Sequence, residues 1–475
     1  MKIHTRIPAP AAGILISLLA GSSGLSGQTA GSASRSVVLA PAGIASTRGT
    51  PDGVLPAEGS DLAALVERTR SVNPAIRSAV EAVAGARARA RAAGILPDPV
   101  LGIGIVNALV SDPLSSEDFM TMRMVQIGQR VPFPGKLDLE REMAAWELAA
   151  TEAEREQVEL EVVAAVERAY YELFFLDRSV EIVSHNRGLL TDFASVTRAR
   201  YGVGTGGQQD VLKAQVEESR LGDELLALRE RAASSMAVLN ALLDRPSDAW
   251  LGRPVLPERI PRAAVPEPGS EVRFTTAALG STTGDGPIPD LETLQRRAQR
   301  ESPMLGTHAA RIQAQRAAVE LAAKAALPDF DVSVGYGQRG GREDMITAML
   351  SIPIPLFKGE KQDALAAAER AELGSLEAAH HAMINDVRAR IAALHASLLR
   401  TRDQLALLRG GILPQARASL ESATAGYPVA SVDFLTLLDN QATLFRHELD
   451  YWRLLAGFGQ DLAELEQLVG GEVLR

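Results

Sequence analysis

The chain has 475 residues and a formal net charge of −10; hydrophobic residues make up 46% of it and aromatic residues only 4%. This length suits several ordinary domains or one long body, and such a composition is typical of long, closely packed helices. The acidic balance, without a clustered basic face, argues against a nucleic-acid partner. Because the chain has no cysteine, disulfides, thiolate metal sites, thiol nucleophiles and lipid attachment through an N-terminal Cys are excluded.

Residues 1–30 have the features of a secretory signal peptide. Lys2 and Arg6 supply positive charge ahead of the apolar run Ala11–Ala20, and small residues follow. The run is short for a membrane-spanning helix, although an uncleaved anchor is the alternative. No later segment has about 18 uninterrupted apolar residues, so no inner-membrane helix bundle is expected. We predict an exported chain whose residues 31–60 form an extended N-terminal segment.

Two parts of the chain, 61–245 and 290–469, repeat one series of motifs. The matched motifs are Asn73-Pro74 with Ser302-Pro303, Leu96-Pro97-Asp98 with Leu327-Pro328-Asp329, and Tyr201–Gln215 with Tyr427–Gln441. The intervening 246–289 is rich in proline and lacks helical periodicity, so it is predicted to be a loop-rich linker. Residues 470–475 form a short C-terminal tail.

Each repeat is predicted to run helix, two strands, long helix, tip, helix. The predicted helices are 62–96, 139–200 and 208–245 in the first repeat, and 290–327, 364–425 and 431–469 in the second. At about 1.5 Å per residue, the two shorter helices of a repeat, stacked end to end, equal the long one in length. This relation predicts a mostly α-helical fold of long antiparallel coiled-coil helices.

Two strand-like runs lie between the first and the long helix of each repeat. They are 100–110 and 119–131 in the first, closed by Asp112–Ser116, and 330–338 and 344–354 in the second, closed by Arg339–Gly341. Each has the length that a tilted strand needs to cross a bilayer, and glycines alternate with bulky apolar residues, which predicts one bulky and one slim face. Four strands cannot close a barrel, so strands in lipid would require several chains to share one. Small soluble sheets are the alternative.

Methionines and histidines were considered as metal ligands. Met120, Met122 and Met124 alternate on one strand face, and Met345 and Met349 partly repeat this pattern. Thioethers suit Cu(I), but packing against lipid or core is the favoured interpretation. The pair His380-His381 is interpreted as part of a solvated helix face, because a metal site needs convergent ligands. No metal site, cofactor or catalytic residue is predicted.

In this order, and twice over, the motifs resemble those of the TolC-type outer-membrane efflux factors. The resemblance covers about 61–469 and rests on Asn73-Pro74, Gln129–Lys136, Tyr201–Gly204 with Asp210–Gln215, and Leu437–Gln441. It implies a homotrimer in which twelve strands form one outer-membrane β-barrel and twelve helices form a periplasmic α-barrel. It also implies a periplasmic adaptor and an inner-membrane RND-type pump as partners. Many relatives carry a lipid-bearing Cys that this chain lacks, so the barrel alone must anchor it in outer-membrane lipid.

The resemblance implies a passive exit duct and not an enzyme. The run Pro132–Lys136 looks closest to the heavy-metal resistance branch, which works with pumps for cobalt, zinc, cadmium, copper or silver. A duct for drugs and organic compounds or for type I secretion is the alternative within the family. A soluble periplasmic coiled-coil adaptor is the alternative outside it.

By resemblance, the residues that dock the adaptor sit at the helix tips. They are Tyr201, Gly202, Val203, Gly204, Thr205 and Gly206 at the first tip, and Gly426, Tyr427, Pro428 and Val429 at the second. Glycine allows a tight reversal between helices. The first tip also spells G-x-G-x-x-G, but a dinucleotide site needs a strand before it, and here a helix precedes it.

The family pattern places acidic residues just past the tips, where carboxylates narrow the pore or hold cations. Asp210 and Asp439 match these positions, whereas Thr436 and Lys213 occupy the other two, which puts a doubled acidic ring in doubt. The alternative role for either Asp is to compensate a helix macrodipole. Both roles stay open for Asp210; the gate is favoured for Asp439, which lies a turn or two inside its helix.

Overall fold

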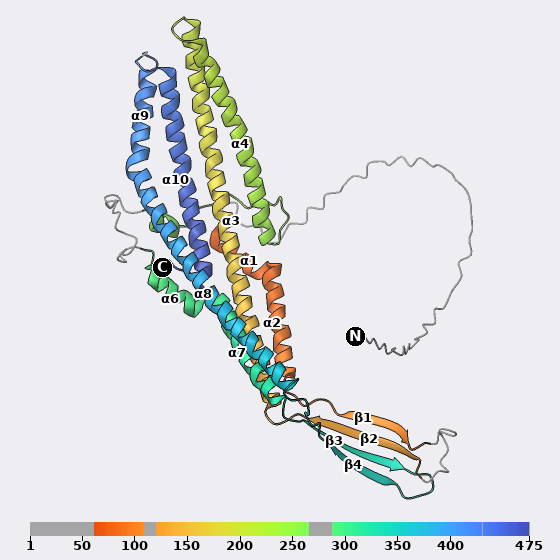
Figure 1. Cartoon of the computed structure of the whole chain (residues 1–475). Coiled ribbons are helices and arrows are strands. Elements are labelled where there is room, and N and C mark those ends of the chain that lie inside the picture. Colours follow the sequence, from red (N-terminus) through yellow and green to blue (C-terminus); the bar gives the residue numbers. More distant parts are fainter. Residues whose placement is uncertain (1–60, 109–119, 266–286, 430, 475) are drawn as a thin grey trace, which may run out of the picture. The chain divides into compact units, whose positions relative to one another are not determined.

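The structure is a computed structural model that describes residues 61–108, 120–265, 287–429 and 431–474. The predicted signal peptide, the segment 31–60 and the turn Asp112–Ser116 lie outside the described residues. The described part is mostly helical and holds one four-stranded antiparallel sheet (Figure 1). None of its helices combines the length and the apolar character that a membrane-crossing helix needs.

The first predicted helix, 62–96, is two helices and not one. Helix α1 spans Leu62–Val72, and α2 spans Pro74–Ala92. Asn73 between them is extended, as expected for a residue before proline, and its side chain accepts hydrogen bonds from the first turn of α2. The side chain also donates to the carbonyl of Leu242, with Nδ2 2.8 Å from the oxygen, so this junction meets the end of α4 (Gln208–Leu242).

The predicted helix 290–327 is broken in the same way. It consists of α6 (Leu291–Glu301) and α7 (Pro303–Lys324), with Ser302 extended before the proline. The end of α10 (Phe434–Val469) packs against this junction so closely that a Cβ at Gly470 would collide with the carbonyl of Glu301. In both cases the last helix of the series ends at a proline-marked break in the first.

The long helix α3 spans Lys136–Gly202 and packs against α2, α4, α7 and α10. Its predicted counterpart, 364–425, is interrupted. Helix α8 (Gln362–Leu407) passes through a π-helical turn, Leu408–Ile412, into α9 (Leu413–Gly426). Pro414 has no N–H to donate to the carbonyl four residues earlier, and a π-turn just before it accommodates this loss.

The core lies where α3 meets α10. Tyr170, Tyr171 and Phe174 are fully buried, and the ring of Phe174 lies edge-on to that of Trp452 with centroids 5.8 Å apart. Gly459 admits Tyr171, because a Cβ there would lie 2.8 Å from the ring. The residues of the predicted tail belong to this core as well, since Val473 and Leu474 are buried in it.

The predicted linker is not entirely irregular. Within it, Arg259–Ala264 forms the short helix α5, three residues of which are buried. The backbone of Val255, just before α5, both donates to and accepts from the hydroxyl of Tyr170. The prediction of a loop-rich linker, which rested on the lack of helical periodicity, therefore missed a short helix that tertiary contacts hold in place.

The four strands are β1 (Val100–Val106), β2 (Met122–Val131), β3 (Phe330–Gln338) and β4 (Met345–Ser351), paired in that order. Strands β1 and β4 are shorter than the predicted 100–110 and 344–354, and β2 begins three residues later than predicted. Because β2 pairs with β3, the two hairpins form one sheet. Strands β1 and β4 are the edges of this sheet.

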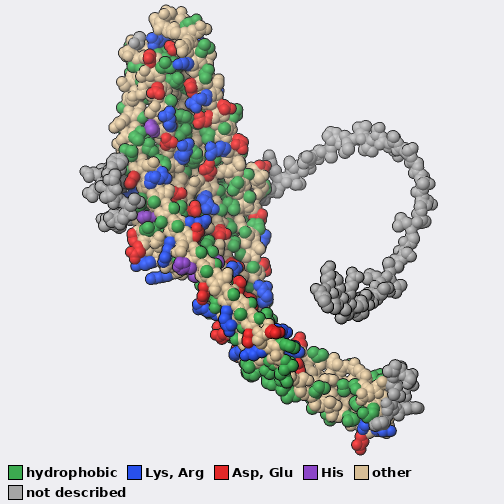
Figure 2. All heavy atoms as spheres, viewed as in Figure 1, with side chains coloured by type: hydrophobic (Ala, Val, Ile, Leu, Met, Phe, Trp, Pro, Cys, Tyr) green, Lys and Arg blue, Asp and Glu red, His purple; other side chains and the backbone are tan. Residues whose placement is uncertain are grey.

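The pairing register separates two kinds of face, as the glycine alternation predicts. One row across the sheet consists of Ile103, Val125, Tyr336 and Ile346, and the next row, on the opposite face, consists of Gly104, Met124, Gly337 and Met345. In the first row, Ile103 and Ile346 are each 78% exposed. Figure 2 shows apolar side chains over the sheet, whereas charged side chains are spread over the helices.

The methionines lie on the slim face, opposite the exposed aliphatic residues. Sulfur atoms of Met122 and Met124 lie over Gly337 and Gly335, close to where a Cβ would be. These thioethers therefore fill the space above the glycines of β3, which is a packing role and agrees with the favoured interpretation that they pack against lipid or core.

Candidate functional site

The first tip joins α3 to α4 through a glycine-dependent reversal. Gly204 has φ +75°, in the left-handed region that glycine adopts most readily, and the N–H of Thr205 donates to the carbonyl of Arg200 at 2.9 Å. Gly206 approaches the end of α3 so closely that a Cβ would lie 3.1 Å from that of Arg200. The tip projects an apolar side chain, since Val203 is 75% exposed.

The second tip is built differently, although it also exposes a valine. Tyr427 turns inward and is buried with Phe434 in a small apolar cluster, while Val429 is 74% exposed. Gly426 has ordinary dihedral angles and is required for space, because a Cβ would meet Ser431 and Val432 below 3 Å. The two tips thus present similar apolar ends on different backbone turns.

Arg200 ties the two tips together, a link that the sequence motifs did not reveal. Its Nη1 donates to the carbonyl of Tyr427 at 2.7 Å, and its guanidinium carbon lies 4.6 Å from the centre of the Tyr427 ring. Thr197, one turn earlier, shares a hydrogen bond of 3.1 Å with the Tyr427 hydroxyl. Of the predicted docking residues, Tyr427 is therefore a buried anchor and not a contact surface.

The predicted gate residues of the first repeat lie in the first two turns of α4. Asp210 is in the first turn and partly buried, with its carboxylate turned back over Gly207. No side chain caps this helix, so a carboxylate here compensates the exposed N–H groups. Lys213 lies one turn further on and is partly buried. The position of Asp210 fits a role in the helix terminus.

The predicted gate residues of the second repeat lie on α10, where a different carboxylate does the capping. Asp433 accepts from the backbone N–H of Thr436 at 2.7 Å, which satisfies the start of the helix. Asp439 is exposed, a turn further along, and forms no ion pair with the residues that the structure describes. Asp439 is therefore not needed to begin α10. The pattern Asp433-x-x-Thr436 is the sequence signal for the cap.

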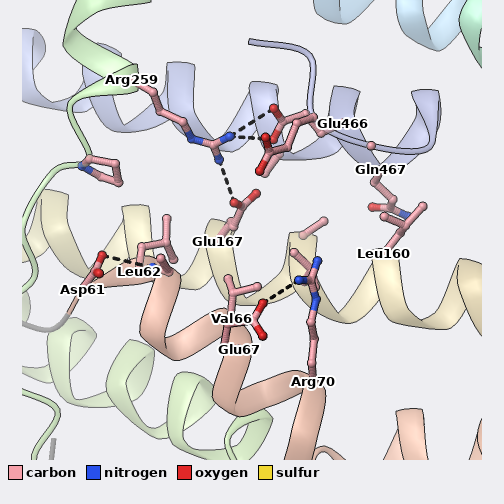
Figure 3. A pocket seen from close by; sticks show the side chains of 17 residues that line it. Asp61, Leu62, Val66, Glu67, Arg70, Leu160, Glu167, Arg259, Glu466 and Gln467 are labelled. Carbon is pink, nitrogen blue, oxygen red and sulfur yellow. Dashed lines mark hydrogen bonds and ion pairs between the residues drawn. The ribbon is translucent and has the colours of Figure 1, made fainter. Parts of the chain in front are cut away.

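A buried ion cluster joins the two halves of the chain (Figure 3). Arg259 of α5 donates to Glu167 of α3 at 2.8 Å and to both oxygens of Glu466 of α10 at 3.2 and 3.3 Å. The cluster borders a cavity of about 380 Å³ that Arg70 and Asp61 also line. Since the three side chains come from α3, the linker and α10, no spacing in the sequence signals them.

The cluster carries two carboxylates and one guanidinium in a site largely closed to water. Burial raises the pKa of Glu167 to about 7, although Arg259 opposes the rise, and burial also raises the pKa of Glu466. Glu466 also accepts from the N–H of Val473, which fixes the chain end. The site joins α3, α5 and α10, and burial favours the protonated form of its carboxylates.

Comparisons with known proteins identify the class of this fold. The chain is 22% identical to the cobalt-zinc-cadmium resistance protein CzcC of Cupriavidus metallidurans over 393 residues, 80% of this chain and 82% of CzcC. The fold matches the outer membrane protein VceC of Vibrio cholerae with a TM-score of 0.71 and 19% identity, covering 87% of this chain and 96% of VceC. CusC, whose solved structures concern transmembrane channel formation, matches with a TM-score of 0.71 and 16% identity, covering 87% and 92%.

The family match covers both halves of the chain. Residues 65–245 and 294–471 correspond to the family described as outer membrane efflux protein. The family and the structural neighbours are channels and not enzymes, which agrees with the sequence prediction. The chain belongs to the outer membrane efflux protein family and is an outer-membrane efflux channel of the tripartite pump type.

Proposed function

We propose that three copies of this chain form one passive duct that carries heavy-metal cations from a periplasmic adaptor and an inner-membrane RND-type pump to the exterior. The observation that carries the assembly is the sheet, whose edge strands β1 and β4 have no outer partner strand in the part of the chain that the structure describes. In lipid, each unsatisfied backbone group would cost several kcal/mol. Edge strands of neighbouring copies supply the missing partners, and three sheets of four strands make a twelve-stranded barrel.

The two faces of the sheet support one orientation of its strands in the proposed barrel. The row with Ile103 and Ile346 faces lipid, because it is apolar and exposed, and the row with Gly104 and Met124 faces the lumen. Glycine and flat-lying methionine on the inner side leave the passage wide. The two motif repeats supply two strands each to every four-stranded sheet.

The tips dock the adaptor in this proposal. Val203 and Val429 are apolar and exposed, and they lie at the turns that the Arg200–Tyr427 contact holds together. Val203→Glu with Val429→Glu should abolish resistance while the protein still reaches the outer membrane. Val216→Glu with Leu226→Glu adds the same two charges at exposed positions along α4 and is the matched control. Full resistance in the double variant would remove the tips from docking.

The metal substrate rests on the similarity to CzcC, which is named for cobalt, zinc and cadmium resistance. Deleting the gene and measuring tolerance to cobalt, zinc, cadmium, copper and silver beside a panel of dyes and antibiotics tests it. Loss of tolerance confined to metals is the expected result. Loss confined to organic compounds would instead assign the duct to drug export.

A further inference from the structure

Two histidines from neighbouring helices come together in the second half of the chain. His308 of α7 and His380 of α8 have ring centroids 6.3 Å apart and ring planes within 22° of parallel. Both side chains are partly buried. The sequence prediction considered only His380 and His381 on one helix and saw no convergent partner; the structure supplies one from another helix, 72 residues earlier in the chain.

The separation of the rings suits two imidazoles on one ion. With metal–nitrogen bonds of about 2.0–2.1 Å, two ligating imidazoles have centroids roughly 5–6.5 Å apart. Nδ1 of His380 is buried and has no hydrogen-bond partner among the described residues. An unsatisfied buried nitrogen is unfavourable, so a ligand that engages this atom would remove that penalty.

The surrounding charges leave the pair available to a cation. Arg311, one turn beyond His308, is held by Glu154 of α3, and Glu377, one turn before His380, is paired with Arg316 at 2.9 Å. The charges of these two ion pairs around the histidines therefore sum to zero.

The helices that carry the rings are fixed relative to each other. Arg316 and Glu377 join α7 to α8. Gln315 of α7 also donates to the carboxylate of Glu369 of α8 at 2.6 Å, two to three helical turns from the histidines. The two rings are stacked, so bringing a nitrogen of each onto one ion requires the side chains to rotate. Among the described residues, no third histidine or carboxylate joins this pair, so any further ligand would have to be water.

We propose that His308 and His380 form a binding site for one divalent transition-metal ion of the zinc and copper class, bridging α7 and α8. The site does not depend on what the duct transports, because it lies between helices of the chain and needs only the two imidazoles. A bound ion would clamp α7 to α8. Binding should follow the general order for nitrogen ligands, with Cu²⁺ held more tightly than Zn²⁺ or Co²⁺.

Electron paramagnetic resonance with Cu²⁺ tests the site on the full chain, purified in detergent on a tag without histidine. We expect one Cu²⁺ per chain with two nitrogen ligands, displaced by excess Zn²⁺. His308→Ala and His380→Ala should each leave at most one nitrogen and weaken binding by at least about tenfold, the scale of even an outer-shell loss. Alanine suits a helix interior, and circular dichroism checks the fold.

His381→Ala is the matched control, because His381 neighbours His380 on α8 but is exposed and lies 3.5 Å from the amide of Asn385. It should bind Cu²⁺ as the wild type does. Thermal unfolding gives a second readout: Zn²⁺ should raise the midpoint of the wild type and of His381→Ala but not of His308→Ala. Equal binding by all variants, or loss in His381→Ala alone, would overturn the proposal.

Discussion

The cluster around Arg259 and the four-stranded sheet both contain groups that need partners, and they differ in where those partners lie. In the cluster, two buried carboxylates from α3 and α10 find their partner within the chain. In the sheet, an apolar face is exposed and the two edge strands have no partner strand among the described residues. The difference teaches that the charged groups of the cluster are paired within one copy, whereas the proposed barrel would pair the sheet edges with neighbouring copies.

The largest expected effect comes from removing the shared cation of the cluster. Arg259→Leu leaves Glu167 and Glu466 buried without a counter-ion, which should destabilise the fold by about 3–5 kcal/mol. Thermal unfolding of the purified protein, followed by helical circular dichroism, measures this. Arg262→Leu, on the same short helix but with an exposed ion pair to Glu258, is the control and should change the midpoint little. Equal midpoints for both variants would contradict a self-contained cluster.

The sheet should respond to charge on one face only. Ile127→Arg places a cation on the lipid face and should cost about 2–4 kcal/mol if it lies at mid-membrane. Gln126→Arg, the neighbouring residue on the opposite face, should assemble normally and alter ion selectivity instead. Heat-resistant oligomers on gels, and their yield from outer membranes, separate the two. Similar losses for both variants would argue against a lipid face.

The pH dependence of the cluster sharpens the contrast further. Because the pKa of Glu167 rises to about 7 in the folded chain from an ordinary value near 4.5, the folded state holds this proton more tightly than the unfolded state. The resulting stabilisation is fully present below pH 4.5 and is lost as pH rises through 7.

Glu167→Gln removes this titration while its amide oxygen can still accept from Arg259. As pH rises from 5 to 8, the free energy of unfolding of the variant should therefore increase relative to that of the wild type by roughly 2–3 kcal/mol. Glu67→Gln, at an exposed carboxylate beside Arg70, is the comparison that should show no such gain. A constant difference between wild type and Glu167→Gln across this range would refute the linkage.

The smallest effect on stability should come from the candidate gate. Asp439 is exposed on α10 and does not cap it, so Asp439→Ala should leave the unfolding midpoint within about 0.5 kcal/mol of the wild type. It should still raise the conductance in planar bilayers or weaken block by divalent cations. Asp433→Ala should instead lower the free energy of unfolding by about 1 kcal/mol, because it removes the cap, and should leave the conductance unchanged. An unchanged conductance record would take Asp439 out of the gate.

Local signals in the sequence were sufficient where one short segment decides the structure. The alternation of glycine with Ile103 and Ile105 predicted the two faces of the sheet, because side chains alternate along any strand. The break at Asn73 also has a local signal, since an Asn-Pro pair caps one helix and cannot continue another, but the prediction of a single helix, 62–96, overlooked it. Pro414 is a similar local signal for an interruption of the helix. Whether that interruption takes the form of a π-turn depends on how the helix continues after it.

The sequence by itself determined the helices, the strand alternation and the family, because each depends on neighbouring residues or on ordered motifs. Only the tertiary structure decided that Arg259 lies between Glu167 and Glu466, that Arg200 holds Tyr427, and that His308 meets His380. The paired residues of these contacts lie 72 to 227 residues apart in the sequence, and the Arg259 cluster draws on three elements. The physical reason is that burial and charge depend on which helices pack together, and no spacing along one helix records that.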